Sequence, residues 1–342
     1  MQLLNTLYVT TPESYLRLEN DTIRIEVERE VKLRVPLHHV GAVVCMGNVG
    51  LSTPLMHRLA DEAVALVLLD GNGRFKARIE GAVSGNVLLR RAQHDRSMDP
   101  AFTLDTARAC VAGKIKNARQ VLLRGAREAK VAEEAAAITR GADDLAASLR
   151  ALPQAADLDT VRGVEGEAAR QYFAAINLLV RADAREAFRM DGRTRRPPRD
   201  RMNALLSFLY SMWMNDCRSA LEAAGLDPQV GFLHALRPGR AALALDLMEE
   251  FRPFADRLAL TLINRAQIDT DDFAEREGGA VLLEGDARKA VVVAYQERKQ
   301  EELTHPLLVQ PVALGLLPLI QARLLARAIR GETDGYLPFL TR

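Results

Sequence analysis

Cysteine is scarce in this chain of 342 residues, and the three cysteines lie far apart. Cys45, Cys110 and Cys217 form no Cys-x-x-Cys pair, which excludes a thiolate zinc site or a dithiol redox motif of that spacing. Because their number is odd, they cannot all pair in disulfides within one chain. We predict that all three are reduced packing residues, as in a cytoplasmic protein.

Long hydrophobic runs and an excess of one charge are also missing. No segment stays apolar long enough to span a bilayer, and the N-terminus lacks the basic start, apolar run and cleavage site of a signal peptide. The net charge is only +1, so a contact with nucleic acid would need arginines gathered on one surface. We expect a cytoplasmic protein that has no membrane partner.

Common nucleotide and hydrolase motifs are missing as well. Gly71 and Gly73 lack the third glycine and the βαβ setting of a dinucleotide fingerprint, and no Gly-Lys-Ser/Thr occurs. No serine stands in a Gly-x-Ser-x-Gly elbow. These absences disfavour dinucleotide enzymes, P-loop enzymes and α/β-hydrolases.

The hydrophobic pattern changes its period near residue 86. Before it, the segments 22–28, 40–46 and 64–69 predict strands, and Ser52 is the predicted N-cap of a helix. After it, the spacing predicts helices at 104–129, 132–150, 157–181, 201–224, 241–263, 286–301 and 307–329. The fold class is therefore α+β, with a β-rich domain at 1–85, a linker at 81–86 and an α-helical domain at 86–342.

Acidic residues and one histidine mark candidate metal ligands. Glu165 shares a helical stripe with small residues, so its carboxylate faces inward and needs either a cation or an arginine partner. His234 follows an apolar run, where a packed core histidine is the other interpretation. Asp246, Glu249 and Glu250 lie within two turns of one helix, and their repulsion calls for a divalent cation or for nearby arginines. Such oxygen and imidazole donors suit Mg²⁺ or Mn²⁺.

Two further features surround these residues. Pro253 predicts that the helix breaks or kinks near Glu249, because proline removes a backbone donor. A loop at 189–201 carries six arginines and two aspartates, which predicts a phosphate-binding surface or else a solvated connector. The predicted DNA-binding residues are Arg189, Arg193, Arg195, Arg196, Arg199 and Arg201.

Four motifs occur in order along the chain. They are Glu165-Gly-x-Ala-Ala-x-x-Tyr, Arg-Arg-Pro-Pro-x-Asp-x-x-Asn-Ala-Leu-Leu-Ser at 195–207, Gly231-Phe-Leu-His, and Asp246-Leu-Met-Glu-Glu-Phe-Arg-Pro253. Together they resemble the CRISPR-associated Cas1 family of spacer-acquisition endonucleases and integrases. The N-terminal region is similar to the β domain of that family, so the resemblance covers essentially the whole chain.

The resemblance implies a metal-dependent enzyme that inserts short foreign DNA into a CRISPR array. It implies Glu165, His234 and Glu249 as catalytic residues and metal ligands, and Asp246 as a nearby second acid. Many family members carry Asp where this chain has Glu249, and the preference for Glu249 over Glu250 rests on the resemblance alone. A DNA 3′-hydroxyl, or water in the nuclease reaction, would attack a backbone phosphate whose charge the metal stabilises.

The same resemblance implies partners. These are double-stranded and branched DNA, a second copy of the chain joined through the β domain, and the small protein Cas2 in a heterohexameric complex. The Glu-Glu-Phe-Arg-Pro ending resembles subtype I-C. Two other functions stay open: a repair nuclease acting on branched DNA without integration, and a non-catalytic DNA-binding scaffold in which the acids pair with arginines.

Overall fold

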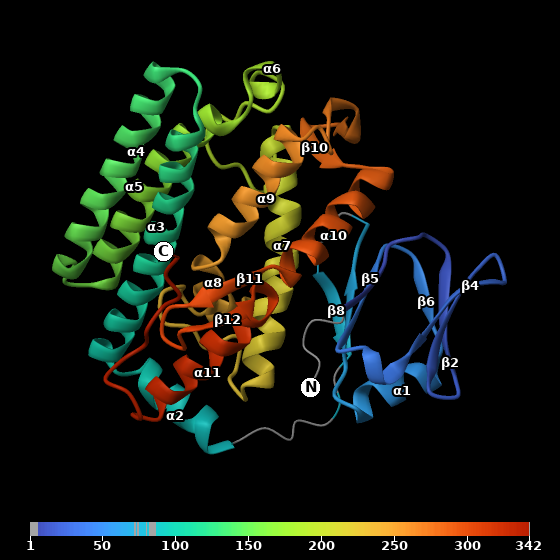
Figure 1. The fold of residues 1–342 in the computed structure, drawn as a ribbon. Coiled ribbons are helices and arrows are strands. Elements are labelled where there is room, and N and C mark those ends of the chain that lie inside the picture. The colour runs from blue at the N-terminus through green and yellow to red at the C-terminus, as the bar shows by residue number, and fades with distance from the viewer. Residues whose placement is uncertain (1–5, 72, 74, 80, 82–86, 342) are drawn as a thin grey trace. The chain divides into compact units, whose positions relative to one another are not determined.

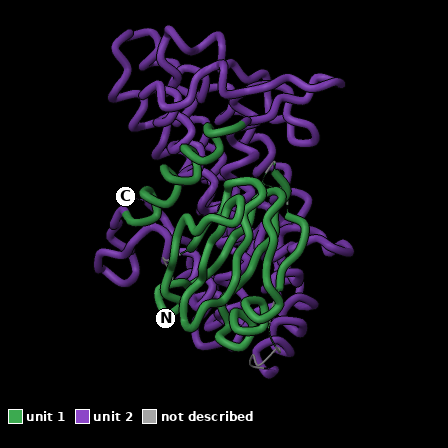
Figure 2. The backbone as a smooth tube through the Cα atoms, turned by 90° about the vertical axis from the view of Figure 1, so that its right-hand side faces the viewer, with its two compact units in different colours: residues 1–85, 285–300 green, residues 86–284, 301–342 purple. Residues whose placement is uncertain are grey.

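The computed structural model describes residues 6–71, 73, 75–79, 81 and 87–341. The chain divides into two compact units, residues 1–85 with 285–300 and residues 86–284 with 301–342 (Figure 2). Apart from Gly81, the predicted linker lies outside the described residues. The sequence pattern places residues 285–300 in the helical domain, whereas the structure groups this helix, α10 (Gly285–Gln300), with the first unit.

The first unit contains two four-stranded sheets. One has the order β4 (Glu30–Pro36), β3 (Thr22–Val27), β2 (Ser14–Glu19) and β6 (Val49–Leu51). The other has the order β1 (Thr6–Val9), β5 (Ala42–Met46), β7 (Ala65–Leu69) and β8 (Phe75–Ile79). The three strands predicted from the sequence correspond to β3, β5 and β7.

Alternation of side chains explains how the first unit builds its core. On β3, Ile23 and Ile25 are buried, and Arg24 between them pairs with Glu26 at 2.7 Å. These isoleucines pack in one cluster with buried side chains of β5, β7 and helix α1 (Thr53–Asp61). The predicted cap of α1 is confirmed, because Ser52 Oγ accepts the Leu55 N–H at 3.4 Å.

The second unit is mostly helical. Its helices are α2 (Val87–Ser97), α3 (Pro100–Glu128), α4 (Ala132–Ala151), α5 (Leu158–Ile176), α6 (Ala182–Arg185), α7 (Arg201–Ala223), α8 (Ala242–Glu249), α9 (Arg252–Asn264) and α11 (Leu317–Ile329). Figure 1 shows α3, α4 and α5 side by side, and α7 packs against α8, α9 and α11. The indole of Trp213 stacks on the Phe251 ring with 5.4 Å between centroids, which joins α7 to the α8–α9 junction. A β-rich region followed by a mostly helical one confirms the predicted α+β class.

Two predicted helices need correction. The helix expected at 241–263 is two helices, since α8 ends at Glu249 and α9 begins at Arg252 with Pro253 in its first turn. This is the break that the proline predicts. The helix expected at 307–329 begins only at Leu317, because residues before it form the hairpin of β11 (Glu302–His305) and β12 (Gln310–Ala313).

One hairpin of the second unit is not predicted from the sequence, and one predicted helix is longer than the helix observed. β9 (Phe273–Arg276) pairs antiparallel with β10 (Ala280–Leu283) in a short hairpin. The helix expected at 157–181 ends as an α-helix at Ile176 and continues as a 3₁₀ turn at Asn177–Leu179. Strands of four residues carry too few side chains to show a period of two, so the sequence pattern does not reveal them.

The burial of the cysteines agrees with the expectation from the sequence. Each of the three cysteines is buried and unbridged, as packing residues are. Within the described residues, no helix is both long and apolar enough to cross a membrane.

Candidate active site

Asp246 positions the loop that carries His234 in the candidate site. Its side chain is fully buried on α8, and its two oxygens accept the backbone N–H groups of Phe232 at 2.6 Å, Leu233 at 3.0 Å and His234 at 2.9 Å. The close fit depends on Gly231, where an added Cβ would lie 2.7 Å from Asp246 Oδ2. The carboxylate therefore folds the loop before α8 into one conformation.

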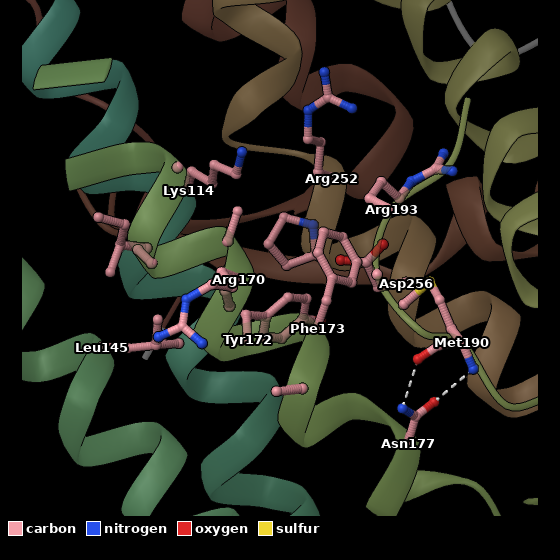
Figure 3. A pocket seen from close by; sticks show the side chains of 18 of the residues that line it. Lys114, Leu145, Arg170, Tyr172, Phe173, Asn177, Met190, Arg193, Arg252 and Asp256 are labelled. Carbon is pink, nitrogen blue, oxygen red and sulfur yellow. Dashed lines mark hydrogen bonds between the residues drawn. The ribbon is translucent and has the colours of Figure 1, made fainter. Parts of the chain in front are cut away.

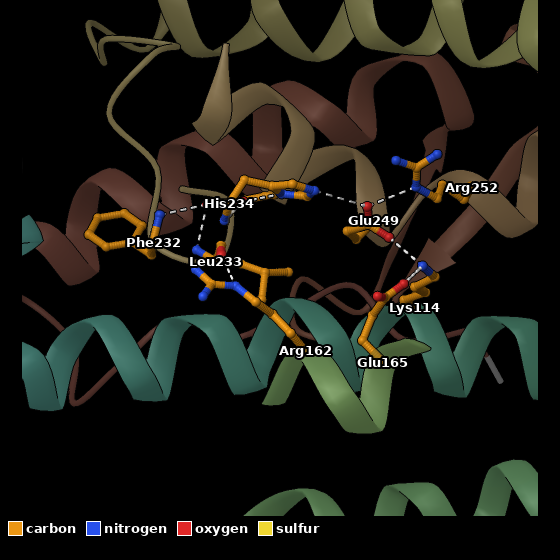
Figure 4. A network of polar contacts seen from close by, with 9 residues as sticks. Lys114, Arg162, Glu165, Phe232, Leu233, His234, Glu249 and Arg252 are labelled. Carbon is orange, nitrogen blue, oxygen red and sulfur yellow. Dashed lines mark hydrogen bonds and ion pairs between the residues drawn. The ribbon is translucent and has the colours of Figure 1, made fainter. Parts of the chain in front are cut away.

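Asp246 also orients the imidazole of His234. His234 Nδ1 lies 2.6 Å from Asp246 Oδ1, and an ionised carboxylate can only accept, so Nδ1 carries the proton. The other ring nitrogen, Nε2, lies 3.9 Å from Glu249 Oε1 (Figure 4). A carboxylate that holds the far nitrogen of a histidine is the usual support for a metal-ligating imidazole. Asp246, the predicted second acid, therefore orients His234. Its two oxygens already accept from three backbone N–H groups and from the imidazole.

The break between α8 and α9 sends Glu249 and Glu250 in opposite directions. Glu249 faces His234, whereas the Glu250 carboxylate accepts hydrogen bonds from the Phe339 N–H at 2.7 Å, the Gln321 amide at 3.1 Å and the Tyr336 hydroxyl. Burial raises the pKa of Glu250 to about 8, although these hydrogen bonds act against the rise. The sequence alone could not choose between the two acids, but only Glu249 lies beside the histidine.

Glu249 is surrounded by cations. Arg252 Nε donates to Glu249 Oε1 at 2.8 Å, and Lys114 Nζ lies 2.8 Å from Glu249 Oε2. Burial would raise the pKa of Glu249, but the charges of Arg252 and Lys114 outweigh it and lower the pKa. The carboxylate is therefore ionised and able to bind a metal at neutral pH.

Glu165 approaches the same place from α5. Its side chain is 26% exposed, and its Oε1 contacts Lys114 Nζ, so that one ammonium group bridges Glu165 and Glu249 (Figure 4). One turn earlier on α5, Arg162 donates to the Leu233 carbonyl at 2.7 Å, which ties α5 to the loop of His234. The side chains of Glu165, His234 and Glu249 come from distant segments and lie near one another, with Lys114 between the two carboxylates.

Lys114 is not among the site residues predicted from the sequence. It lies on α3 along the same stripe as the buried residues Cys110, Asn117 and Ala118. A lysine at the position of a core residue needs an acidic partner inside the protein, and this signal could have identified it.

The donor types at this place fit a divalent cation. In the part of the chain that the structure describes, no three His, Cys, Asp or Glu side chains are grouped closely enough to hold a metal ion. The Lys114 ammonium stands between the two carboxylates. Two carboxylates and one imidazole are ligands that Mg²⁺ and Mn²⁺ accept.

A cavity of about 530 Å³ adjoins these residues in the second unit (Figure 3). Lys114, Arg193 and Arg252 bring positive charge to it, while Phe173 and Leu145 line it with apolar surface. Deep inside, the Tyr210 hydroxyl donates to Asp256 at 2.5 Å, and the guanidinium groups of Arg193 and Arg252 lie 5.1 and 4.8 Å from the centre of the Tyr210 ring. The cavity therefore combines cationic groups with an apolar wall.

The six arginines of the 189–201 loop have different environments. Arg193 points inward and donates to Asn203 and Ser207, and burial lowers its pKa. Arg201 donates to the Ala187 carbonyl at 3.1 Å. These two arginines stabilise the loop, which limits what they can offer to a phosphate.

The other four arginines of the loop are exposed. Arg189 pairs with Asp191 at 3.1 Å, and Arg199 donates to the Gly278 carbonyl. Arg195 and Arg196 have no hydrogen bond or ion pair with any residue that the structure describes, and Arg195 also lines the cavity. A free positive surface therefore lies at 195–196.

Residues 7–297 match the family model of the CRISPR associated protein Cas1. The chain is 57% identical over 341 residues to the CRISPR-associated endonuclease Cas1 1 of Moorella thermoacetica, covering 99% of each chain.

Two solved structures share the fold. A casposase bound to its integration product has a TM-score of 0.83 at 20% identity, over 98% of this chain and 92% of that one. A Cas6-RT-Cas1–Cas2 complex contains a chain with a TM-score of 0.82 at 24% identity, over 98% of this chain and 36% of that one. At these identities the likeness concerns the fold.

Proposed function

Because this chain belongs to the Cas1 family of CRISPR-associated proteins, we propose that it is a metal-dependent DNA endonuclease and integrase that inserts short foreign DNA into a CRISPR array. The observation that carries this proposal is the convergence of Glu165, Glu249 and His234 Nε2 beside a cavity with positively charged walls. Acidic side chains placed among so many cations suit a site that handles phosphates.

Glu165, Glu249 and His234 would hold Mg²⁺ or Mn²⁺. When bound, the ion supplies positive charge to the phosphate group as its negative charge grows during displacement. Arg252 keeps Glu249 ionised and fixes its orientation, and Asp246 keeps the proton of His234 on Nδ1. His234 would then serve as a ligand through Nε2.

The reaction is a phosphoryl transfer with two nucleophiles. A DNA 3′-hydroxyl attacks a backbone phosphate of the array during strand joining, and the bond from that phosphorus to the 3′-oxygen of the array strand breaks, so that a new 3′-hydroxyl leaves. Water attacks during cleavage, and one backbone P–O bond breaks in the same way to leave a hydroxyl and a terminal phosphate. Arg195 and Arg196 would contact neighbouring phosphates and hold the strand in place. The alignment of nucleophile and phosphate is then the main contribution of the protein.

The proposed partners follow from the family and from the shared fold. We expect a homodimer joined through the first unit, and a heterohexamer with the small protein Cas2 on double-stranded or branched DNA. Support comes from the Cas1–Cas2 complex and the DNA-bound casposase among the similar structures. Assignment to subtype I-C rests on the Glu-Glu-Phe-Arg-Pro segment and stays a prediction.

A Glu165→Gln variant tests the enzymatic proposal. Glutamine keeps the shape but removes the charge, so we expect loss of cleavage and strand joining on branched DNA with Mn²⁺ or Mg²⁺, and an unchanged melting temperature. Glu167→Gln is the matched control, because Glu167 lies on the outer face of α5 and pairs with Arg170. Full activity of Glu165→Gln would contradict the proposal.

A non-catalytic scaffold is the second candidate, and one observation favours it. The pairing of Glu249 with Arg252 and Lys114 is the ion-pair network that such a scaffold would contain. In that case Glu165→Gln would lower the stability, and the wild-type protein would neither cut nor join DNA. A repair nuclease would cut branched DNA but would not join a 3′-end to a CRISPR array when Cas2 is present.

A further inference from the structure

Lys114 occupies the position between two carboxylates where the proposed function places a divalent cation. Its Nζ contacts Glu165 Oε1 and lies 2.8 Å from Glu249 Oε2. The side chains of Lys114 and Glu249 are only 13% and 4% exposed, so water and salt screen this interaction weakly. One ammonium group therefore neutralises two acids that would otherwise repel each other.

Neither Arg252 nor His234 bridges Glu165 and Glu249 as Lys114 does. Arg252 reaches Glu249 from the opposite side, through Oε1, and makes no ion pair with Glu165. The imidazole of His234 faces the same oxygen at 3.9 Å. A divalent cation held by both Glu165 and Glu249 would therefore compete with the Lys114 ammonium for these two carboxylates.

The side chain of Lys114 has room to leave. It lines the cavity of about 530 Å³ next to the site, and the lysine stem has four rotatable bonds. A divalent cation and an ammonium group that contact the same two carboxylates repel each other strongly. Binding of one therefore disfavours binding of the other. The ammonium would then turn toward the cavity.

We propose that Lys114 is a built-in competitor of the divalent cation, which holds Glu165 and Glu249 together in the ion-free protein and weakens their affinity for the metal. This inference rests on the proposed function, because it concerns the same site. It assigns to Lys114 a positioning role that neither a core residue nor a metal ligand would have.

Mn²⁺ titration by calorimetry tests the inference on four proteins. We expect Lys114→Met to bind Mn²⁺ about tenfold more tightly than the wild type, because no ion pair has to break first. Lys114→Arg keeps the charge and should bind as the wild type does. Lys116→Met, two residues further on the same helix, is the matched control and should also bind as the wild type does.

The outcomes separate the inference from the function it rests on. Binding by the wild type with equal or weaker binding by Lys114→Met would overturn the inference alone, since a merely structural lysine loosens the site when removed. No Mn²⁺ binding by the wild type would overturn the proposed function together with the inference.

A second measurement needs no variant and covers the case in which Lys114→Met does not fold. Acetylation of the wild-type protein, followed by mass spectrometry, reports how free each lysine amine is. We expect Lys114 to be acetylated faster with Mn²⁺ than with a chelator, and Lys116 at the same rate in both. An unchanged rate at Lys114 would overturn the inference.

Discussion

At the scale of single residues, neighbours in the sequence have separate tasks. Asp246, Glu249 and Glu250 lie within five positions, yet Asp246 holds a loop, Glu249 faces the histidine and Glu250 binds the C-terminal segment. Spacing on an ideal helix cannot show this, because the helix ends at Glu249. The roles follow from which donors reach each carboxylate.

Asp246→Asn should damage both the fold and the metal site. An amide offers one acceptor oxygen where the carboxylate accepts from three backbone N–H groups and one imidazole, so we expect a loss of about 2–4 kcal/mol in the free energy of unfolding. We also expect about 10–100-fold weaker Mn²⁺ binding, because His234 loses its support. Denaturant unfolding and calorimetry measure the two effects.

The control for this variant is Asp105→Asn, whose carboxylate is 70% exposed and pairs only with Arg108. It should change the free energy of unfolding by about 0.5 kcal/mol or less. An Asp246→Asn protein as stable as this control would contradict the role assigned to Asp246.

Asp256 predicts a pH dependence of stability. Burial raises its pKa to about 6 from 3.8, although the hydrogen bond from Tyr210 acts against the rise. The folded state therefore favours the protonated acid, and its contribution to stability is present below pH 3.8 and lost as the pH rises through about 6. Between pH 4 and pH 7, the free energy of unfolding of Asp256→Asn should fall by about 3 kcal/mol less than that of the wild type. Parallel curves of unfolding free energy against pH would contradict this.

At the scale of elements, the loop at 189–201 and the junction of α8 and α9 surround the site. Arg193 and Arg201 anchor the loop from inside, which leaves Arg195 and Arg196 exposed on it. The junction is held from behind by α3 and by the C-terminal segment, where Asn117 donates to the carbonyls of Glu250 and Phe339 at 2.9 Å each.

Reversing the charge at Arg195 and Arg196 should weaken DNA binding. For Arg195→Glu with Arg196→Glu, we expect the slope of log K against log salt to decrease by about 2, because two phosphate contacts are lost. Arg140→Glu with Arg150→Glu makes the same charge change on α4 and should leave the slope as it is. Equal slopes for the first variant and the wild type would remove the loop from the DNA-binding surface.

Gly113 on α3 tests the packing behind the junction. A Cβ at Gly113 would lie 2.8 Å from Glu250 Cγ and 3.1 Å from Pro338 Cβ, so Gly113→Ala forces both to move. We expect a loss of about 1–3 kcal/mol in the free energy of unfolding.

Gly163→Ala is the matched control, because Gly163 also lies in a helix but has nothing within 4 Å of an added Cβ. It should gain about 0.5–1 kcal/mol from helix propensity. If both substitutions changed the free energy of unfolding in the same direction, this account of the junction would be contradicted.

The sequence predicts those elements whose side-chain pattern is long. The stripes of α3, α4 and α7 span many turns, and the cap Ser52 lies where the pattern of α1 begins. The hairpins β9–β10 and β11–β12 are missed because their strands have four residues each. The separation of Glu249 from Glu250 depends on tertiary contacts with the C-terminal segment, which no local pattern contains.

At the scale of the whole molecule, the candidate site belongs to the second unit alone. Lys114, Glu165, His234 and Glu249 all lie within residues 86–284, although the last is 135 positions from the first by their numbering. Folding of the helical unit therefore assembles the ligands, and their positions depend on the order of its helices. α10, by contrast, belongs with the β sheets despite its place late in the sequence.

The central claim is that Glu165, His234 and Glu249 hold one divalent cation. X-ray diffraction from crystals soaked in MnCl₂, collected at the manganese absorption edge, measures this directly. The account predicts an anomalous peak in coordinating contact with a carboxylate oxygen of Glu165, a carboxylate oxygen of Glu249 and Nε2 of His234. A peak elsewhere, or Lys114 still bridging the two acids with no peak between them, would contradict it.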